Sequence, residues 1–347
     1  MIDGVLLKTL TSGTRAAVVL LACYAATATP LLSQTPQPLG AQDRTRLAEV
    51  VRLATRLRSR IWPGWERTPL AILLVTDPAE YLVGHPEPGV EFTRSGHDSI
   101  LAPDIWIRPR VFSPTLLATF PAVGALPTIV VGTAERTGKS SSEWVLTLLH
   151  EHFHQWQYSL PDYYHRVGLL GLAGDDSTGM WMLNYPFPYD SVPVQLASKR
   201  LAETLSSAID ATPARRRQAL SAVTEARADL AAHLTSADNR YLEFQLWQEG
   251  VARFIEYRTA AAAARLGEPS AGFRALPDYE SYRSLAGRGR LNLRHELDEF
   301  DLGQHKRTSF YPLGAALALL LEANRVEWKR RYEEAPFALT SLLWSGR

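Results

Sequence analysis

The 347-residue sequence is poor in cysteine and lysine and has almost no net charge. Its single cysteine excludes a disulfide framework and a cysteine-rich metal site. The 37 Lys and Arg nearly balance the 36 Asp and Glu, so charge gives no reason to expect a nucleic acid or an acidic surface as partner. Only five of the basic residues are lysine and the others are arginine. We interpret this preference for arginine as a general bias of composition rather than as a binding patch.

The overall composition is that of an ordinary globular protein. Hydrophobic residues make up 46% and charged residues 21% of the chain, which excludes a disordered protein and allows a sizeable core. At roughly 100–200 residues per domain, the length allows two domains or one unit with two lobes. We expect one unit with two lobes.

The N-terminal segment has the pattern of a targeting signal. An uncharged apolar run over residues 16–28 ends in the A-x-A-like site Ala26-Thr27-Ala28. The run is too short for a membrane-spanning helix, which needs about 20 apolar residues. We therefore expect a signal peptide at residues 1–28 and an extended spacer at residues 29–42.

The only cysteine, Cys23, lies inside this segment, in the stretch Leu20-Leu21-Ala22-Cys23. The stretch resembles a bacterial lipobox, although Leu at its second position is atypical. Two alternatives therefore remain, a lipoprotein signal ending before Cys23 and an uncleaved N-terminal anchor. We expect a secreted, periplasmic or cell-envelope protein that touches the membrane only through this signal or through a lipid anchor at Cys23.

In the remaining chain, the predicted strands lie in the N-terminal half and most of the predicted helices lie in the C-terminal half. Residues 43–60 have the apolar spacing of a helix, and residues 194–332 are mostly helical by the same criterion. Three short apolar runs are predicted as strands, at residues 70–75, 105–109 and 128–131. The fold class expected is α+β. We divide the chain into an N-terminal α/β lobe at 43–160, a mostly helical insertion at 161–235 and a helical C-terminal lobe at 236–347.

Three histidines gather in the segment HEHFH at residues 150–154, which matches H-E-x-x-H. In a helix, His150 and His154 lie on one face and can share a zinc ion, whereas His152 points to the other side. In a strand, all three histidines lie on one face and form an H-x-H site.

The flanking residues favour the helix. Ser140-Ser-Ser-Glu143 has the form of a capping box, and apolar residues follow at helical spacing with no glycine or proline before Pro161. We therefore expect the zinc helix to begin at this box.

A catalytic zinc usually has three protein ligands and one open position. The metzincin pattern fails, because Gln157 and Leu160 occupy its glycine and third-histidine positions. Further along, the segment WQEGVA at residues 247–252 lies in a strongly helical stretch and carries Glu249.

Together these motifs resemble the gluzincins, the thermolysin-like zinc peptidases, and above all the aminopeptidase N family. That family reads H-E-x-x-H-Q-W, then W-x-N-E-G-x-A-x-Y-x-E, then Y-x-K-G-A. This chain has HEHFHQW at residues 150–156, WQEGVA at 247–252 with Glu256 behind it, and YPLGA at 311–315, in the same order.

The resemblance implies a zincin-like fold and one Zn²⁺ per chain, held by His150, His154 and Glu249. It implies that Glu151 is the general base toward the attacking water and that Tyr311 hydrogen-bonds the oxyanion. We also expect the missing side chain at residue 250 to let the helix of the third ligand approach the zinc helix closely.

Two departures from the family limit the inference. Here 94 residues separate the second histidine from Glu249, against roughly 18 in the family. Asp175, Asp176 and Glu203 are therefore rival third ligands. The G-x-M-E-N motif that anchors a substrate amino group is also missing, so aminopeptidase activity does not follow.

We predict an exported zinc metallopeptidase acting on a peptide or protein substrate. Residues 128–131 are interpreted as an edge strand that pairs with an extended peptide, with an interior strand as the alternative. Two other functions remain open, a catalytically inactive zincin-like binding module and a strand-borne H-x-H zinc enzyme with a non-peptide substrate.

Overall fold

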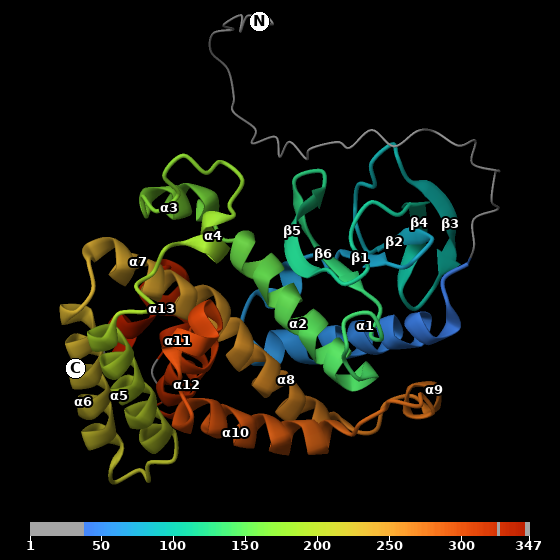
Figure 1. Cartoon of the computed structure of the whole chain (residues 1–347). Coiled ribbons are helices and arrows are strands. Elements are labelled where there is room, and N and C mark those ends of the chain that lie inside the picture. Colours follow the sequence, from blue (N-terminus) through green and yellow to red (C-terminus); the bar gives the residue numbers. More distant parts are fainter. Residues whose placement is uncertain (1–37, 325–326, 344–347) are drawn as a thin grey trace, which may run out of the picture.

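The computed structural model describes residues 38–324 and 327–343, so the expected signal peptide and Cys23 lie outside the described residues. The described chain combines one six-stranded mixed sheet with a larger helical part (Figure 1), which confirms the α+β class. Among the described helices, none is both long and apolar enough to span a membrane.

The sheet occupies the N-terminal half and has the strand order β3-β4-β2-β1-β6-β5. Its strands are β1 (Ile72–Val75), β2 (Ala79–Val83), β3 (Thr93–Asp98), β4 (Ala102–Pro109), β5 (Leu117–Val123) and β6 (Leu126–Gly132). β1 and β6 are parallel, and the other neighbours are antiparallel. The three predicted strands are confirmed as β1, β4 and β6.

The prediction that residues 128–131 form an edge strand is wrong. β6 lies between β1 and β5, and the two edge strands of the sheet are β3 and β5. The burial of the two strands explains the difference. Residues 128–131 are buried on both faces of the sheet, whereas β5 is mostly half-buried and contains Pro121. A continuous apolar run is typical of an interior strand, and proline is tolerated at an edge.

The two faces of the sheet are covered differently. One face, with Ile72, Leu74 and Ile129, belongs to the main hydrophobic core, which continues through the helices to the C-terminal end of the described chain. The other face carries a smaller cluster that includes Leu73 and Val130. Because both faces are covered, β1 is apolar at every position.

The helices begin with α1 before the sheet and continue after it. They are α1 (Ala41–Ile61), α2 (Ser141–Tyr158), α3 (Tyr163–Leu169), α4 (Trp181–Asn184), α5 (Val192–Ile209), α6 (Arg216–Ala232), α7 (Ser236–Gln245), α8 (Val251–Leu266), α9 (Ala271–Arg274), α10 (Tyr282–Asp298), α11 (Leu302–His305), α12 (Phe310–Ala323) and α13 (Trp328–Glu334). A π-helical turn, η2 (Leu246–Gly250), joins α7 to α8.

The position of α2 decides where the functional site lies. α2 contacts α1, α8, β5 and β6, and it runs between the sheet and the helical half (Figure 1). The segment predicted as an insertion supplies α3 to α6, of which α5 packs against α6, α10 and α12. This segment therefore extends the helical half, while α2 stays between the sheet and the helices.

Candidate metal centre

The segment with three histidines is a helix. The Ser140 side chain accepts a hydrogen bond from the Glu143 backbone, and the Glu143 side chain accepts one from the Ser140 backbone, so the capping box is present. α2 then continues without interruption to Tyr158. The strand-borne H-x-H hypothesis is therefore wrong.

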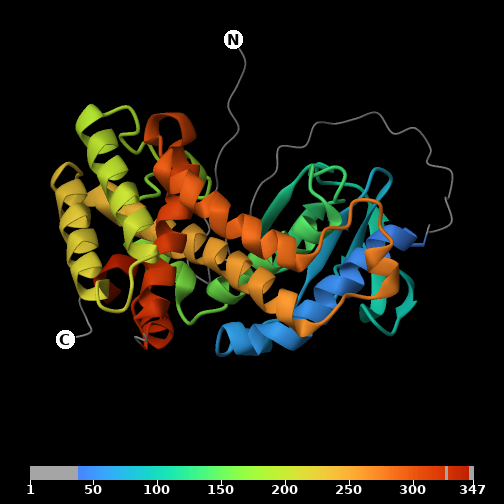
Figure 2. The ribbon, with the colours of Figure 1, turned by 90° about the horizontal axis from the view of Figure 1, so that it is seen from below.

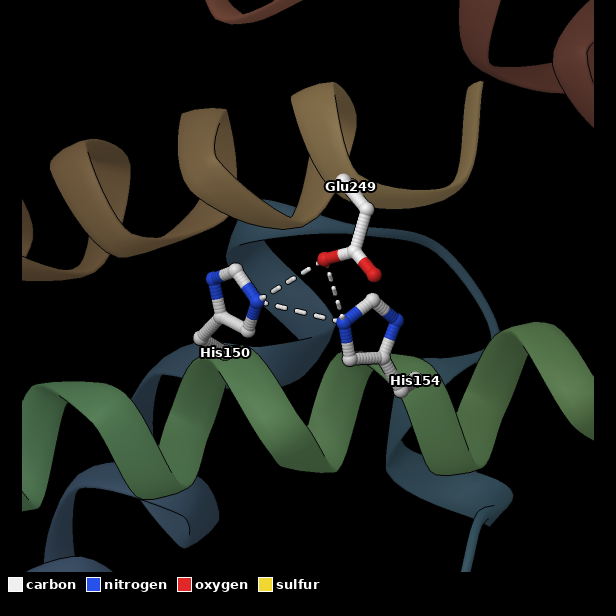
Figure 3. A group of neighbouring side chains, drawn as sticks. All are labelled: His150, His154 and Glu249. Carbon is white, nitrogen blue, oxygen red and sulfur yellow. Dashed lines mark hydrogen bonds and ion pairs between the residues drawn. The ribbon is translucent and has the colours of Figure 1, made fainter. Parts of the chain in front are cut away.

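His150, His154 and Glu249 meet at one point between α2 and η2 (Figure 3). The Nε2 atoms of the two histidines lie 3.1 Å apart. Oε2 of Glu249 lies 3.8 Å from Nε2 of His150 and 3.4 Å from Nε2 of His154. In a tetrahedral zinc site with bonds of about 2.0–2.2 Å, the ligand atoms lie about 3.3–3.6 Å apart. The three atoms therefore surround a space that fits a single zinc ion.

The hydrogen bonds at Nδ1 of His154 direct its Nε2 toward Nε2 of His150 and Oε2 of Glu249. Nε2 of Gln157 donates to the carbonyl oxygens of Trp247 and Gln248, so its Oε1 is the acceptor. This oxygen lies 2.6 Å from Nδ1 of His154, whereas Nε2 of Gln248 lies 3.0 Å from the same Nδ1 and can donate to Oε1 of Gln157 instead. Because two acceptor atoms at 2.6 Å would repel each other, we assign the proton of His154 to Nδ1. The lone pair of His154 is then on Nε2, on the side of Glu249. Such support of a ligand histidine is typical of metal sites.

His150 is held in a strongly negative environment. Its Nδ1 is buried and has no hydrogen-bond partner among the described residues, and Oε2 of Glu256 lies 3.6 Å away. Burial favours neutral His150, but Glu249 and Glu256 outweigh burial and raise its pKa to about 9. Burial also favours the neutral form of Glu256 and by itself would raise its pKa. Arg253 and His150 outweigh burial and lower the pKa of Glu256 to about 2. The site therefore favours a positive charge at this point.

Glu249 reaches the histidines from the π-helical turn η2, a rare conformation that often marks functional positions. Its side chain is 16% exposed. Although Arg253 lies one helical turn after Glu249, it pairs with Glu256 and Glu296 instead. Burial alone would raise the pKa of Glu249, but His154 and His150 reverse this and hold it well below its ordinary value. Glu249 is therefore an anionic third ligand candidate.

The expectation for Gly250 requires a correction. A Cβ atom at residue 250 would lie 2.4 Å from Cα of Gly314, which is on α12. A Cβ atom at residue 314 would lie 2.6 Å from Cα of Gly250 and from the carbonyl oxygen of Leu246. The glycine thus allows η2 to approach α12 rather than α2, and it brings the motif with Tyr311 beside the motif with Glu249.

Tyr311 lies next to this centre, with its ring parallel to that of His150 at a centroid distance of 6.4 Å. Nη1 of Arg307 donates to the Tyr311 hydroxyl at 2.9 Å and lies 3.4 Å from Oε1 of Glu249. Burial raises the pKa of Tyr311 well above its ordinary value, and Glu249 adds to the effect. The phenol therefore keeps its proton and can donate it in a hydrogen bond.

Glu151 is fixed by an edge strand of the sheet. Oγ1 of Thr119, on β5, donates to Oε2 of Glu151 at 2.8 Å, and it also lies 3.1 Å from the Glu151 carbonyl oxygen. The Glu151 residue is 6% exposed. A carboxylate with one oxygen held in this way keeps the other oxygen available for a proton.

His152 points away from the candidate ligands, as expected for a helix. Its ring is 5.3 Å from that of Trp65, and its Nδ1 lies 2.8 Å from Oε1 of Gln155. Burial lowers the pKa of His152 to about 3. His152 is therefore a neutral core residue.

The rival third ligands lie elsewhere. Asp176 accepts hydrogen bonds from the backbone of Thr178 and Trp181, while Asp175 and Glu203 are exposed. Among the described residues, the group of candidate metal ligands consists of His150, His154 and Glu249.

Several supporting residues were not predicted. Glu256 was noted only as part of a motif, and Thr119, Gln157, Gln248 and Arg307 had no assigned role. Gln157 is one helical turn beyond His154, and Arg307 is one turn before Tyr311, so helical spacing could have indicated these two. For Thr119 the sequence holds no comparable signal.

No protein-family model, curated protein or solved structure matches this chain. The assignment of the site therefore depends on its own geometry and chemistry.

Proposed function

We propose that the chain is an exported zinc metallopeptidase with a gluzincin-like site and Glu151 as general base. The proposal depends on three atoms that lie close together, namely Nε2 of His150, Nε2 of His154 and Oε2 of Glu249. The two nitrogens are 3.1 Å apart, and the oxygen lies 3.4 Å from His154 and 3.8 Å from His150. This donor set, two histidines and one glutamate, is that of zinc peptidases. The same three residues are those implied by the motif resemblance.

Each neighbouring residue has a role in such a reaction. A zinc ion held by His150, His154 and Glu249 would supply Lewis acidity toward a water molecule and a carbonyl group. Glu151, oriented by Thr119, accepts the proton of the attacking water and passes it to the leaving amine. The protonated phenol of Tyr311 and the guanidinium of Arg307 stabilise the oxyanion that forms from the carbonyl.

The substrate proposed is an extended peptide or protein segment. β5 is an edge strand of the sheet, and its Thr119 is hydrogen-bonded to Glu151. A peptide that pairs with this edge would have its backbone beside the general base. The main-chain recognition expected here selects peptide geometry and does not define a side-chain preference.

Metal analysis tests the ligand assignment. We expect about one zinc per chain in the wild type and its loss in each of the variants His150→Ala, His154→Ala and Glu249→Ala, since each removes one of three protein ligands. The measurement is inductively coupled plasma mass spectrometry after gel filtration in a metal-buffered solution.

The matched control is His152→Gln, a change in the same motif on the opposite side of α2. This variant should keep its zinc, and circular dichroism should show that all four variants retain their helices. Full zinc content in Glu249→Ala would remove Glu249 from the ligand set. Equal zinc loss in His152→Gln and His150→Ala would contradict the two-histidine site.

A further inference from the structure

A second site lies away from the candidate metal centre, between α1 and the sheet. A cavity of about 280 Å³ is bounded on one side by one face of α1, from Leu47 to Arg58, and on the other by the strands β1 and β2. Figure 2 shows α1 lying along the strands. Apolar residues from α1 and the strands, among them Leu47, Val51 and Ile72, line part of the cavity, and Thr55 and Thr68 are polar residues of the same lining.

Three charged residues also line the cavity, and of these Arg58 is half-buried whereas Glu66 and Arg67 are exposed. Nη1 of Arg58 donates to the carbonyl oxygen of Thr68 at 3.2 Å and to Nε2 of the neutral His152 at 3.2 Å. Neither partner carries a negative charge. No carboxylate among residues 38–324 and 327–343 forms an ion pair with Arg58, and the remaining N–H groups on Nε and Nη2 have no acceptor among these residues.

A half-buried guanidinium without a counter-ion is unfavourable, because its charge is partly removed from water. Burial lowers the pKa of Arg58, and Glu66 offsets this only in part. Glu66 is at the rim, 41% exposed, and lies 4.0 Å from Arg67. The cavity therefore combines apolar walls with a half-buried guanidinium that can accept a bidentate anion, and the exposed Glu66 and Arg67 complete its lining.

We propose that this cavity binds a small monocarboxylate with an apolar chain, with the carboxylate on Nε and Nη2 of Arg58 and the chain between α1 and the sheet. A planar guanidinium matches a carboxylate, and the apolar walls match an alkyl chain. The volume is close to the lower limit of about 300 Å³ for ligand pockets, which favours a short chain. This site is independent of the proposed peptidase function.

Isothermal titration calorimetry of the complete chain with octanoate at neutral pH tests the proposal. We expect saturable binding of one octanoate per chain and at least tenfold weaker binding of octan-1-ol, which has the same chain without the charge. Arg58→Gln should weaken octanoate binding at least tenfold, which corresponds to about 1.4 kcal/mol. Arg56→Gln, an exposed arginine on the same helix, is the matched control and should bind octanoate like the wild type.

A second variant keeps the test decisive if Arg58→Gln fails to fold. Val51 is half-buried at the cavity, and Val51→Phe fills part of the space without a change of charge. It should reduce octanoate affinity while the circular dichroism spectrum stays that of the wild type. Absence of saturable octanoate binding, equal affinity for octan-1-ol, or unchanged affinity in folded Arg58→Gln or Val51→Phe would overturn the proposal.

Discussion

Replacing Glu151 with Gln is expected to lower peptide hydrolysis by about 10²–10⁴-fold, because general-base catalysis contributes about this much. The amide cannot accept the proton of the attacking water, yet it has nearly the same shape. It can still accept the hydrogen bond that Thr119 donates at 2.8 Å. Zinc content should therefore equal that of the wild type, which separates a loss of chemistry from a loss of metal.

Hydrolysis is best measured with casein and with a fluorogenic peptide library on zinc-loaded protein. Glu203→Gln, which neutralises an exposed carboxylate on α5, is the matched control and should leave turnover and zinc content unchanged. Full activity in Glu151→Gln would refute its role as the base. If the zinc-loaded wild type cleaves none of these substrates, the inactive binding module becomes the better hypothesis.

Gly314→Ala is expected to destabilise the fold by about 3 kcal/mol, at the upper end of overpacking effects. The new Cβ atom would lie 2.6 Å from Cα of Gly250 and from the carbonyl oxygen of Leu246. Both neighbours are backbone atoms, so η2 and α12 have to separate. Urea denaturation followed by circular dichroism, in the presence of a chelator, measures the free energy of unfolding without a contribution from bound metal.

Gly287→Ala is the matched control for this change. Gly287 also lies inside a helix, α10, but a Cβ atom there meets nothing within 4 Å. Alanine should stabilise this position by roughly 0.5–1 kcal/mol, since it lowers the conformational freedom of the unfolded chain. A Gly314→Ala variant as stable as the wild type would show that the close contact between η2 and α12 is absent in solution.

Helix α2 could be predicted because its sequence signals are local. The capping box that begins with Ser140 and the two histidines up to His154 fall within 15 consecutive residues, so the 3.6-residue period places them relative to one another. Glu249 was reached only through motif order, because 94 residues separate it from His154. No periodicity in the sequence defines the π-helical turn that presents it.

The errors and omissions in the predicted sheet have a common cause. The order of the strands depends on pairing between segments that are far apart in the sequence. β2 was not predicted because Glu80 interrupts its apolar pattern. In the fold Arg108 of β4 neutralises this carboxylate across the sheet at 2.7 Å. β5 was not predicted because it contains Pro121, and β6 was placed at an edge because its pairing partner on that side was not predicted. Thr119 was missed for the same reason.

The long separation between His154 and Glu249 has a consequence for the stability of the whole chain. A metal ion coordinated by both residues would cross-link the chain and close a loop of 94 intervening residues. Loop closure of this length restricts the unfolded chain strongly, which is the main effect attributed to a disulfide bond. Residues 38–324 and 327–343 contain no cysteine. In this part of the chain, the metal ion would therefore be the cross-link between the half that contains the sheet and the helical half.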